Sequence, residues 1–354
     1  MPEIKSNFDI ENIFGKDISF IDNVIANKEH HVQRIQIPKS DGSKRIIIAP
    51  DKDLKYLQKA IYWKILMRYR PSSAAHGFVR GRSIKTNALP HVGAKSIGKI
   101  DIKSFFDTIS VHHLQNCLFG NKNICRLCKY YERMMYGLCH PSLYHNKLKN
   151  YQYKCEEIKA LFIPEYCQTT GYQSLFKRII ELCTISGHTA QGFPTSPMLA
   201  NIVMRGYDEK MLKYCGERGI VYTRYADDMA FSSMSLDKND LKAIVQKKAY
   251  RLLWAFGFKP NMKKTIWKNR GGCMKVCGVV VNEKTSVKRK LVMLFRAKVH
   301  HATVKNKEHT TKSLIRQLKG WASYLMSIDH NKGQKYMNQL IEFEKKMQIS
   351  TQAV

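Results

Sequence analysis

The sequence is poor in acidic residues: 28 aspartates and glutamates stand against 60 lysines and arginines in 354 residues, a formal net charge of +32. A chain this basic is unsuited to a cationic partner. Its charge indicates a polyanion, of which nucleic acid is the first candidate. An anionic membrane surface is the competing candidate.

Long apolar segments are also missing. The sequence has no run of about 18 apolar residues, which a membrane-spanning helix needs. It has no charged-then-apolar signal at its amino terminus and no internal repeat or low-complexity block. We therefore expect a soluble, cytoplasmic protein without a membrane partner, in which the ten cysteines are reduced thiols or metal ligands rather than disulfides. A hydrophobic content of 44% argues against general disorder.

The stretch IVYTRYADDMAFSS, residues 220–233, places two adjacent aspartates between runs of strand-forming residues. Adjacent residues of a regular strand point to opposite faces, so Asp227 and Asp228 can act together only if the chain turns there. The pattern predicts a β-hairpin with its turn at these aspartates. Two carboxylates at one turn repel each other, and a hard divalent metal ion would remove that repulsion. A solvated turn is the alternative, because aspartate is common in turns.

Hydrophobic periodicity along the rest of the chain predicts an α+β fold. A basic turn within 38–50 separates two extended runs, and a helix follows over 51–69, with Asp53 as its cap and Pro71 as its stop. Beyond it the pattern predicts, in chain order, a strand running into a turn within 95–110, helices over 198–214 and 240–258, a short strand over 276–281, and basic helices to the end.

A third aspartate, Asp101, ends the apolar strand pattern IGKID. If this strand end lies beside the hairpin, it brings a third carboxylate to Asp227 and Asp228. Three carboxylates can hold two Mg²⁺ ions, which activate an attacking hydroxyl and stabilise a departing pyrophosphate. The sequence therefore predicts a two-metal phosphoryl-transfer site.

Five segments, in the order IDIKSFFDTI, QGFPTSPMLAN, YTRYADDMAFS, GFKPNMKKT and VCGVVV, resemble the ordered polymerase motifs of reverse transcriptases. The resemblance covers about residues 40–282. It implies an RNA-directed DNA polymerase with a right-hand fold: an amino-terminal region and fingers over 1–95, a palm of antiparallel sheet and helices over 96–282, and a basic helical thumb over 283–354. The palm would also carry fingers elements and a cysteine-rich insertion at about 117–170.

The resemblance also implies catalytic roles for individual residues. Asp101, Asp227 and Asp228 match the metal-binding aspartates, and Ile102 would offer a backbone carbonyl. Lys264 matches a lysine that protonates pyrophosphate, with a solvated lysine as the alternative.

Other residues match positions that bind the deoxynucleoside triphosphate in this family. Phe106 matches the aromatic steric gate that crowds the sugar 2′ position, and a plain core phenylalanine is the alternative. The family's loop that packs against template and nucleotide is matched by Gln191, Gly192 and Pro194. The hairpin that holds the triphosphate is matched by Lys44 and Arg45. A simple turn at the glycine and a solvated hairpin tip are the alternatives.

The segment HGFVRGRSIKTNALPHVG contains Asn87, Ala88 and His91 in the N-A-x-x-H spacing of bacterial retron reverse transcriptases. The retron pattern has V-T-G before the thumb, and this chain departs from it with Cys277 in the middle position. The resemblance implies a structured noncoding RNA that is copied into single-stranded DNA from an RNA 2′-hydroxyl, giving branched RNA–DNA. It also implies antiphage defence with an effector protein encoded nearby. The alternatives are a group II intron-like or diversity-generating reverse transcriptase, and a non-catalytic RNA-binding protein with a polymerase fold.

Two groups of residues are candidates for RNA contact. Asn87 and His91 belong to the retron-type motif, although a lone histidine also commonly supports a loop. The thumb candidates are basic residues suited to phosphates: Lys288, Arg289, Lys290, Arg296 and Lys298. An ordinary thumb that grips any template–primer duplex is the alternative.

Several cysteines lie between the motifs IDIKSFFDTI and QGFPTSPMLAN, in an interval that is longer than the polymerase motifs need. Cys125 and Cys128 have the spacing of half a zinc site, and the candidates for the other half are Cys139, His140, His145 and Cys155. Reduced, partly buried cysteines are the alternative.

Overall fold

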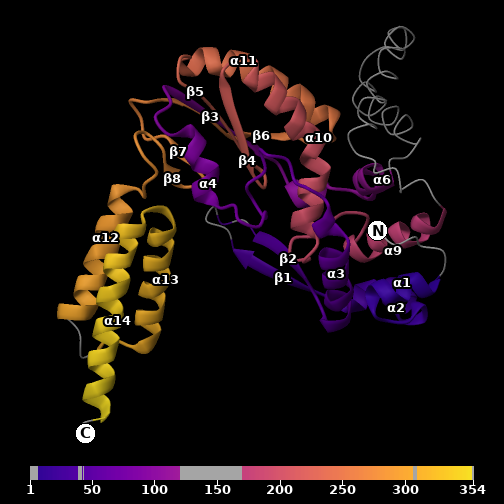
Figure 1. Cartoon of the computed structure of the whole chain (residues 1–354), viewed down its shortest axis with the longest axis horizontal. Coiled ribbons are helices and arrows are strands. Elements are labelled where there is room, and N and C mark those ends of the chain that lie inside the picture. Colours follow the sequence, from indigo (N-terminus) through magenta and orange to yellow (C-terminus); the bar gives the residue numbers. More distant parts are fainter. Residues whose placement is uncertain (1–6, 39–41, 43, 120–169, 306–308, 353–354) are drawn as a thin grey trace.

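The computed structural model describes residues 7–38, 42, 44–119, 170–305 and 309–352 (Figure 1). Its central element is an antiparallel sheet of four strands in the order β4 (Ile220–Tyr225), β5 (Asp228–Ser233), β3 (Ser96–Ile102) and β6 (Pro260–Asn269). The expected hairpin at the aspartates and the strand that ends near Asp101 are therefore neighbours.

Two long helices, α10 (Ser196–Gly216) and α11 (Lys238–Ala255), pack against this sheet (Figure 1). Their apolar faces close the main core, as the periodicity predicted, because Leu199, Val203 and Tyr207 of α10 are buried. On the sheet, the rings of Tyr222 and Phe231 stack with centroids 5.0 Å apart. This packing fixes the end of the sheet that carries the aspartates.

Amino-terminal helices form a second layer with segments from later in the chain. It contains α1 (Asn7–Phe14), α2 (Ile18–Ala26), η1 (Lys28–His31), α3 (Lys52–Lys64), η2 (Leu66–Arg68), α6 (Val111–Phe119) and α9 (Thr170–Cys183). The predicted basic turn joins β1 (Val32–Pro38) to β2 (Lys44–Pro50). The predicted cap of α3 is wrong: Asp51, not Asp53, accepts the Leu54 amide at 2.9 Å, because the helix begins directly after Asp51.

A small subdomain joins the sheet to the carboxy-terminal helices. It combines α4 (Ile84–Ala88) and η3 (Leu89–His91) with β7 (Lys275–Val276) and β8 (Val279–Val280). The expected single strand over 276–281 is wrong. Cys277 and Gly278 have φ values of +47° and +84° and turn the chain, which makes a tight hairpin of it.

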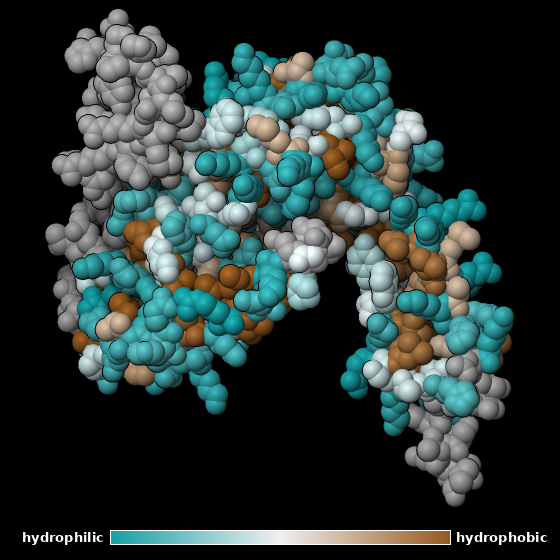
Figure 2. Space-filling view, turned by 180° about the vertical axis from the view of Figure 1, so that it is seen from behind, coloured by the Kyte–Doolittle hydropathy of each residue, from teal (hydrophilic) through white to brown (hydrophobic). Residues whose placement is uncertain are grey.

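The last three helices form a separate bundle (Figure 1). They are α12 (Arg289–His300), α13 (Lys312–Ile328) and α14 (His330–Gln352), with a π-helical turn, η6 (His301–Lys305), after the first. Phe295, Leu318 and Leu340 lie in the bundle's own core. The space-filling view shows a hollow between this bundle and the rest of the chain (Figure 2). Among the described helices, none is both long and apolar enough to span a membrane.

Candidate active site

The three predicted metal-binding aspartates meet at one end of the central sheet. Asp101 lies directly opposite Asp228 in the register of β3 and β5. The amide of Ile102 donates a hydrogen bond of 3.1 Å to the carbonyl oxygen of Asp227 in the turn. Backbone pairing therefore joins the strand end to the hairpin, as the sequence predicted.

The carboxylates repel one another in this arrangement. Burial raises the pKa of Asp227, and the negative charges of Asp101 and Asp228 raise it further. Two lysines offset part of this repulsion: Lys264 Nζ lies 3.4 Å from Asp101 Oδ2, and Lys99 Nζ lies 3.6 Å from Asp228 Oδ1. A cluster of like charges that the fold holds together, with oxygen donors only, fits hard divalent cations.

Another group of possible metal ligands lies elsewhere in the described residues. The ligand atoms of His31, Asp51 and Asp53 all lie within 4.8 Å of one another, a spacing that the three aspartates of the central sheet do not share. Asp51 already caps α3 and lies 2.7 Å from His31 Nδ1. We therefore assign this group to the structure of the helix terminus.

A bulge in β6 carries Lys264 to the site. Lys99 of β3 opposes Ile266, whereas Asp101 opposes Asn261, so residues 262–265 protrude from the pairing. Bulges beside active sites redirect side chains. Here the bulge leaves the Lys264 side chain 66% exposed and beside Asp101, where a phosphate leaving group could reach it.

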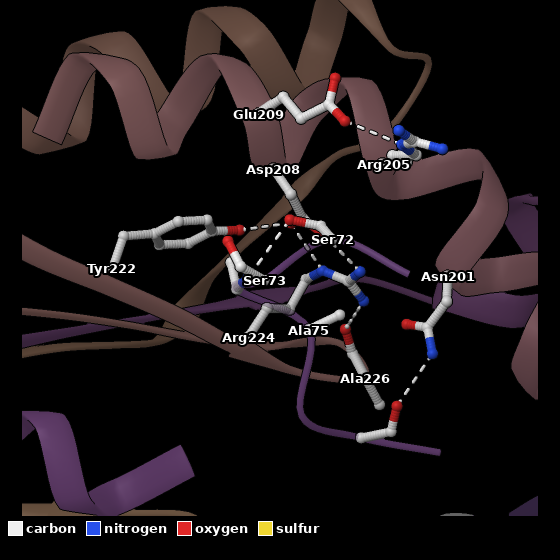
Figure 3. Close-up of polar contacts among 12 residues, drawn as sticks. Ser72, Ser73, Ala75, Asn201, Arg205, Asp208, Glu209, Tyr222, Arg224 and Ala226 are labelled. Carbon is white, nitrogen blue, oxygen red and sulfur yellow. Dashed lines mark hydrogen bonds and ion pairs between the residues drawn. The ribbon is translucent and has the colours of Figure 1, made fainter. Parts of the chain in front are cut away.

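A buried ion pair supports the turn between β4 and β5 (Figure 3). Arg224 donates from Nε and Nη2 to the two carboxylate oxygens of Asp208, at 2.9 and 2.6 Å. Arg224 Nη1 donates to the carbonyl oxygen of Ala226 at 3.0 Å, and the Tyr222 hydroxyl donates to Asp208 at 2.7 Å. Both charged side chains are fully buried. Ala226 has a left-handed φ of +56°, so the guanidinium stabilises an unfavourable conformation next to Asp227.

The ion pair of Arg224 and Asp208 was not predicted from the sequence, although the sequence contains a signal for it. Arg224 occupies an inward position of a strand whose neighbours Tyr222 and Phe231 are apolar, and Asp208 follows the buried Tyr207 on α10. Charged residues at buried positions are normally paired.

The loop before residue 78 covers the same turn. Arg224 and this loop exchange backbone hydrogen bonds of 2.7 Å, from the Arg224 amide to Ala74 and from the His76 amide to Arg224. Asn201 Nδ2 donates to the carbonyl oxygen of Gly77 at 2.9 Å (Figure 3). A Cβ at Gly77 would lie 2.6 Å from the Ala226 nitrogen, so only glycine allows this approach.

Phe106 lies on α5 (Phe105–Thr108), just after Asp101 and β3. Its ring is half-buried and packs against Phe105 and Phe78, with centroids 5.4 and 6.2 Å away. Thr189 donates a hydrogen bond of 2.8 Å to the Phe106 carbonyl oxygen, which fixes this short helix. The ring is thus partly exposed in the segment that follows Asp101, and its role as a gate stays a prediction.

The expected nucleotide-binding loop packs against the β1–β2 hairpin. The Ile48 amide donates to the Gln191 carbonyl oxygen at 2.7 Å. Gly192 has a φ of +117°, and a Cβ there would collide with the carbonyl oxygen of Ile48, so backbone packing alone accounts for this glycine. Pro194 is half-buried ahead of α10. Lys44 and Arg45 are exposed at the start of β2, where phosphate could reach them.

The structure does not support RNA contact by the retron-type motif, because Asn87 and His91 are fully buried. His91 Nδ1 lies 2.7 Å from Ser232 Oγ and its Nε2 lies 2.8 Å from Thr223 Oγ1. Asn87 Nδ2 donates to Cys277 Sγ at 3.3 Å. The two side chains therefore connect the 84–91 segment to the central sheet and to the β7–β8 turn, which agrees with the alternative that they support this loop rather than contact RNA.

The basic thumb candidates lie at the surface of α12 and of the residue that precedes it. All five side chains are exposed, so phosphate groups could reach them: Lys288, Arg289, Lys290, Arg296 and Lys298. Large apolar side chains are exposed between them, namely Leu291, Met293 and Leu294. RNA binding by this helix stays a prediction.

The zinc candidates Cys125, Cys128, Cys139 and Cys155 lie outside the described residues. In the part of the chain that the structure describes, Cys117, Cys183, Cys215, Cys273 and Cys277 are free thiols, as expected.

Comparisons with known proteins agree with this geometry. The family model of reverse transcriptase (RNA-dependent DNA polymerase) matches residues 37–288. The retron Mx162 reverse transcriptase of Myxococcus xanthus is 29% identical over 330 residues, which cover 90% of this chain and 62% of that protein. The retron Ec86 reverse transcriptase of Escherichia coli is 26% identical over 325 residues, covering 91% of this chain and 83% of that protein.

A third relative, the retron Mx65 reverse transcriptase of Myxococcus xanthus, is 30% identical over 279 residues, covering 76% of this chain and 56% of that protein. The chain thus spans less than two thirds of the length of both Myxococcus relatives. The matches confirm the resemblance to retron reverse transcriptases. With the antiparallel sheet and surrounding helices they also confirm the α+β polymerase fold. The boundaries of fingers, palm and thumb stay predictions.

Proposed function

Because the chain belongs to the reverse transcriptase (RNA-dependent DNA polymerase) family, we propose that it extends DNA on an RNA template at Asp101, Asp227 and Asp228. The observation that carries this proposal is the register of the sheet. It sets Asp101 opposite Asp228 and leaves Asp227 in the adjoining turn, so three carboxylates converge where nucleotidyl transfer needs them.

The chain's own residues account for the steps of the reaction. Two Mg²⁺ ions, held by the three carboxylates and the Ile102 carbonyl, would activate the attacking hydroxyl and stabilise the developing charge on phosphate. Lys264, 3.4 Å from Asp101, would give a proton to the departing pyrophosphate. Phe106 would lie against the sugar of the incoming nucleotide and exclude a 2′-hydroxyl.

Within this family, we propose a retron enzyme. Its partner would be a structured noncoding RNA, copied into single-stranded DNA from a 2′-hydroxyl of that RNA, in antiphage defence with an effector protein. The similarity to retron enzymes over most of this chain supports the proposal. The exposed basic positions of α12 support it as well, because a duplex stem can be held by its phosphates irrespective of base identity.

Single-turnover incorporation of one deoxynucleotide on an RNA template tests the polymerase, with Asp227→Asn as the matched inactive control. We expect incorporation by the parent only. Failure of the parent with every template would favour a non-catalytic RNA-binding protein.

The RNA that copurifies with the chain tests the retron. We expect one structured RNA, bound more tightly than an unrelated hairpin at physiological salt, and a DNA product that keeps a branched nucleotide after alkaline hydrolysis. An unbranched product, or equal affinity for both RNAs, would leave a group II intron-like or other reverse transcriptase.

A further inference from the structure

Phe78 combines two features that do not help the fold. Its φ is +61°, in the left-handed region that bulky side chains avoid, and its ring is 44% exposed. A side chain this exposed gains only part of the stabilisation that full burial would give, so packing alone does not explain the strained backbone. Strained residues of this kind are concentrated at functional sites.

The ring of Phe78 lies beside the candidate active site. Its centroid is 6.2 Å from that of Phe106 and 6.3 Å from that of Tyr225. Phe106 follows Asp101 along the chain by five positions, and Tyr225 precedes Asp227 by two. The three rings are therefore adjacent to the place where a new nucleotide would be joined.

The loop holds Phe78 in this position before any ligand arrives. The preceding residue, Gly77, is fixed by the hydrogen bond from Asn201 and by its close approach to Ala226. Arg82 Nη1 donates to the carbonyl oxygens of Ser72 and Ser73, at 2.8 and 3.1 Å, and also to that of Ala75. These contacts prevent the backbone from relaxing out of the left-handed conformation, so the exposed ring is preorganised.

We propose that Phe78, together with Phe106 and Tyr225, forms an aromatic surface against which the base pair at the active site packs. The ligand is a nucleotide, either the incoming triphosphate or the terminal pair of template and primer, and the contact is with its base or sugar. Aromatic side chains serve this purpose because every base has an apolar face. The inference rests on the proposed polymerase function and adds a substrate-contacting residue to it.

Three substitutions separate this role from a structural one. Phe78→Asn and Phe78→Gly remove the ring and suit the left-handed backbone, so we expect an unchanged or higher thermal midpoint. Phe78→Tyr keeps the ring. Trp63→Ala is the matched control, because Trp63 is a 64% exposed aromatic of α3 outside the site.

Single-turnover kinetics give the dissociation constant of the incoming nucleotide, and titration gives that of template–primer. For Phe78→Asn and Phe78→Gly we expect one of these constants to rise about 10- to 100-fold, from the usual contribution of a stacked base. A rise in the first constant would identify the incoming nucleotide as the group that contacts Phe78. A rise in the second would identify the terminal pair of template and primer. Phe78→Tyr and Trp63→Ala should stay within about threefold of the parent.

Two results would overturn the inference. One is parental values of both constants in Phe78→Asn. The other is a lower thermal midpoint with fewer active molecules but unchanged constants in those that remain, which would make Phe78 a structural residue. If the parent itself incorporates no nucleotide, the proposed function fails, and that outcome is distinct from both.

Discussion

Arg224 donates a hydrogen bond of 3.0 Å to the carbonyl oxygen of Ala226, the residue immediately before Asp227. The same guanidinium is held by both carboxylate oxygens of Asp208 on α10 (Figure 3). The orientation of the turn that carries Asp227 therefore depends on a buried ion pair between a strand and a helix.

Removing Arg224 alone should unfold much of this region, because it leaves the Asp208 carboxylate buried without a partner. We expect Arg224→Met to lower the free energy of unfolding by about 3–5 kcal/mol. The double variant Asp208→Asn with Arg224→Met removes both charges and keeps an acceptor for the Tyr222 hydroxyl. It should recover most of that stability, as measured by urea unfolding.

The double variant should nevertheless polymerise slowly, because nothing then holds the Ala226 carbonyl. We expect a single-turnover rate at least about tenfold below that of the parent, at an unchanged nucleotide dissociation constant. A parental rate in a folded double variant would show that the pair serves stability alone.

Asp227→Asn should abolish most DNA synthesis without lowering the stability of the folded chain. The pKa of Asp227 is raised by burial and by its acidic neighbours, so its negative charge destabilises the folded chain at neutral pH. We expect DNA synthesis to fall by a factor on the order of a thousand, since several kcal/mol of transition-state stabilisation is lost. The thermal midpoint should stay or rise, and RNA binding should persist. Asp101→Asn should lose synthesis similarly, and activity within a few-fold of the parent in either variant would contradict the site.

Phe106→Ala should admit ribonucleotides, because the half-buried ring would no longer crowd the sugar 2′ position. The measurement is the ratio of kcat/KM for a deoxynucleotide and the matching ribonucleotide. Phe106→Tyr is the control that keeps the ring and should keep the parental ratio. An unchanged ratio in Phe106→Ala would place the gate elsewhere.

Zinc at Cys125 and Cys128 is testable by metal analysis of the purified protein. If the two cysteines bind zinc, the parent should contain about one equivalent and a Cys125→Ser, Cys128→Ser variant none, because their thiolates would supply half of the ligands. Less than about a tenth of an equivalent in the parent would leave these cysteines as ordinary thiols.

The core of the site was predictable because its signals are local. A pair of aspartates between two strand patterns fixes a turn, and Asp101 at a strand end needs only one pairing to join it. Gly278 was an equally local signal for a turn. The valines on both sides of it nevertheless led us to predict one continuous strand instead of the β7–β8 hairpin. The cap of α3 was misplaced by two residues because Asp51 and Asp53 both suit a helix start, and only the backbone at the first turn decides between them.

The rest of the site depends on tertiary packing that sequence periodicity does not encode. Arg224 and Asp208 lie on a strand and a helix, 16 positions apart, and their pairing follows from how α10 crosses the sheet. Burial also decided the roles of Asn87 and His91. Their motif spacing left RNA contact and support of the loop open, and the fold uses both side chains to connect the 84–91 segment to neighbouring elements.

His91 should make stability depend on pH. Burial lowers its pKa to about 3, against 6.5 for the free side chain. Below pH 6.5 the unfolded chain therefore binds a proton that the folded chain cannot accept, so stability is complete above that pH and falls on acidification. Between pH 7 and pH 5 we expect His91 to account for a loss of about 2 kcal/mol in the free energy of unfolding. Urea unfolding of the parent and of His91→Gln at both pH values measures this difference, since the shifted pKa of His76 is common to both proteins. Equal losses in the two proteins would mean that His91 is protonated in the folded state.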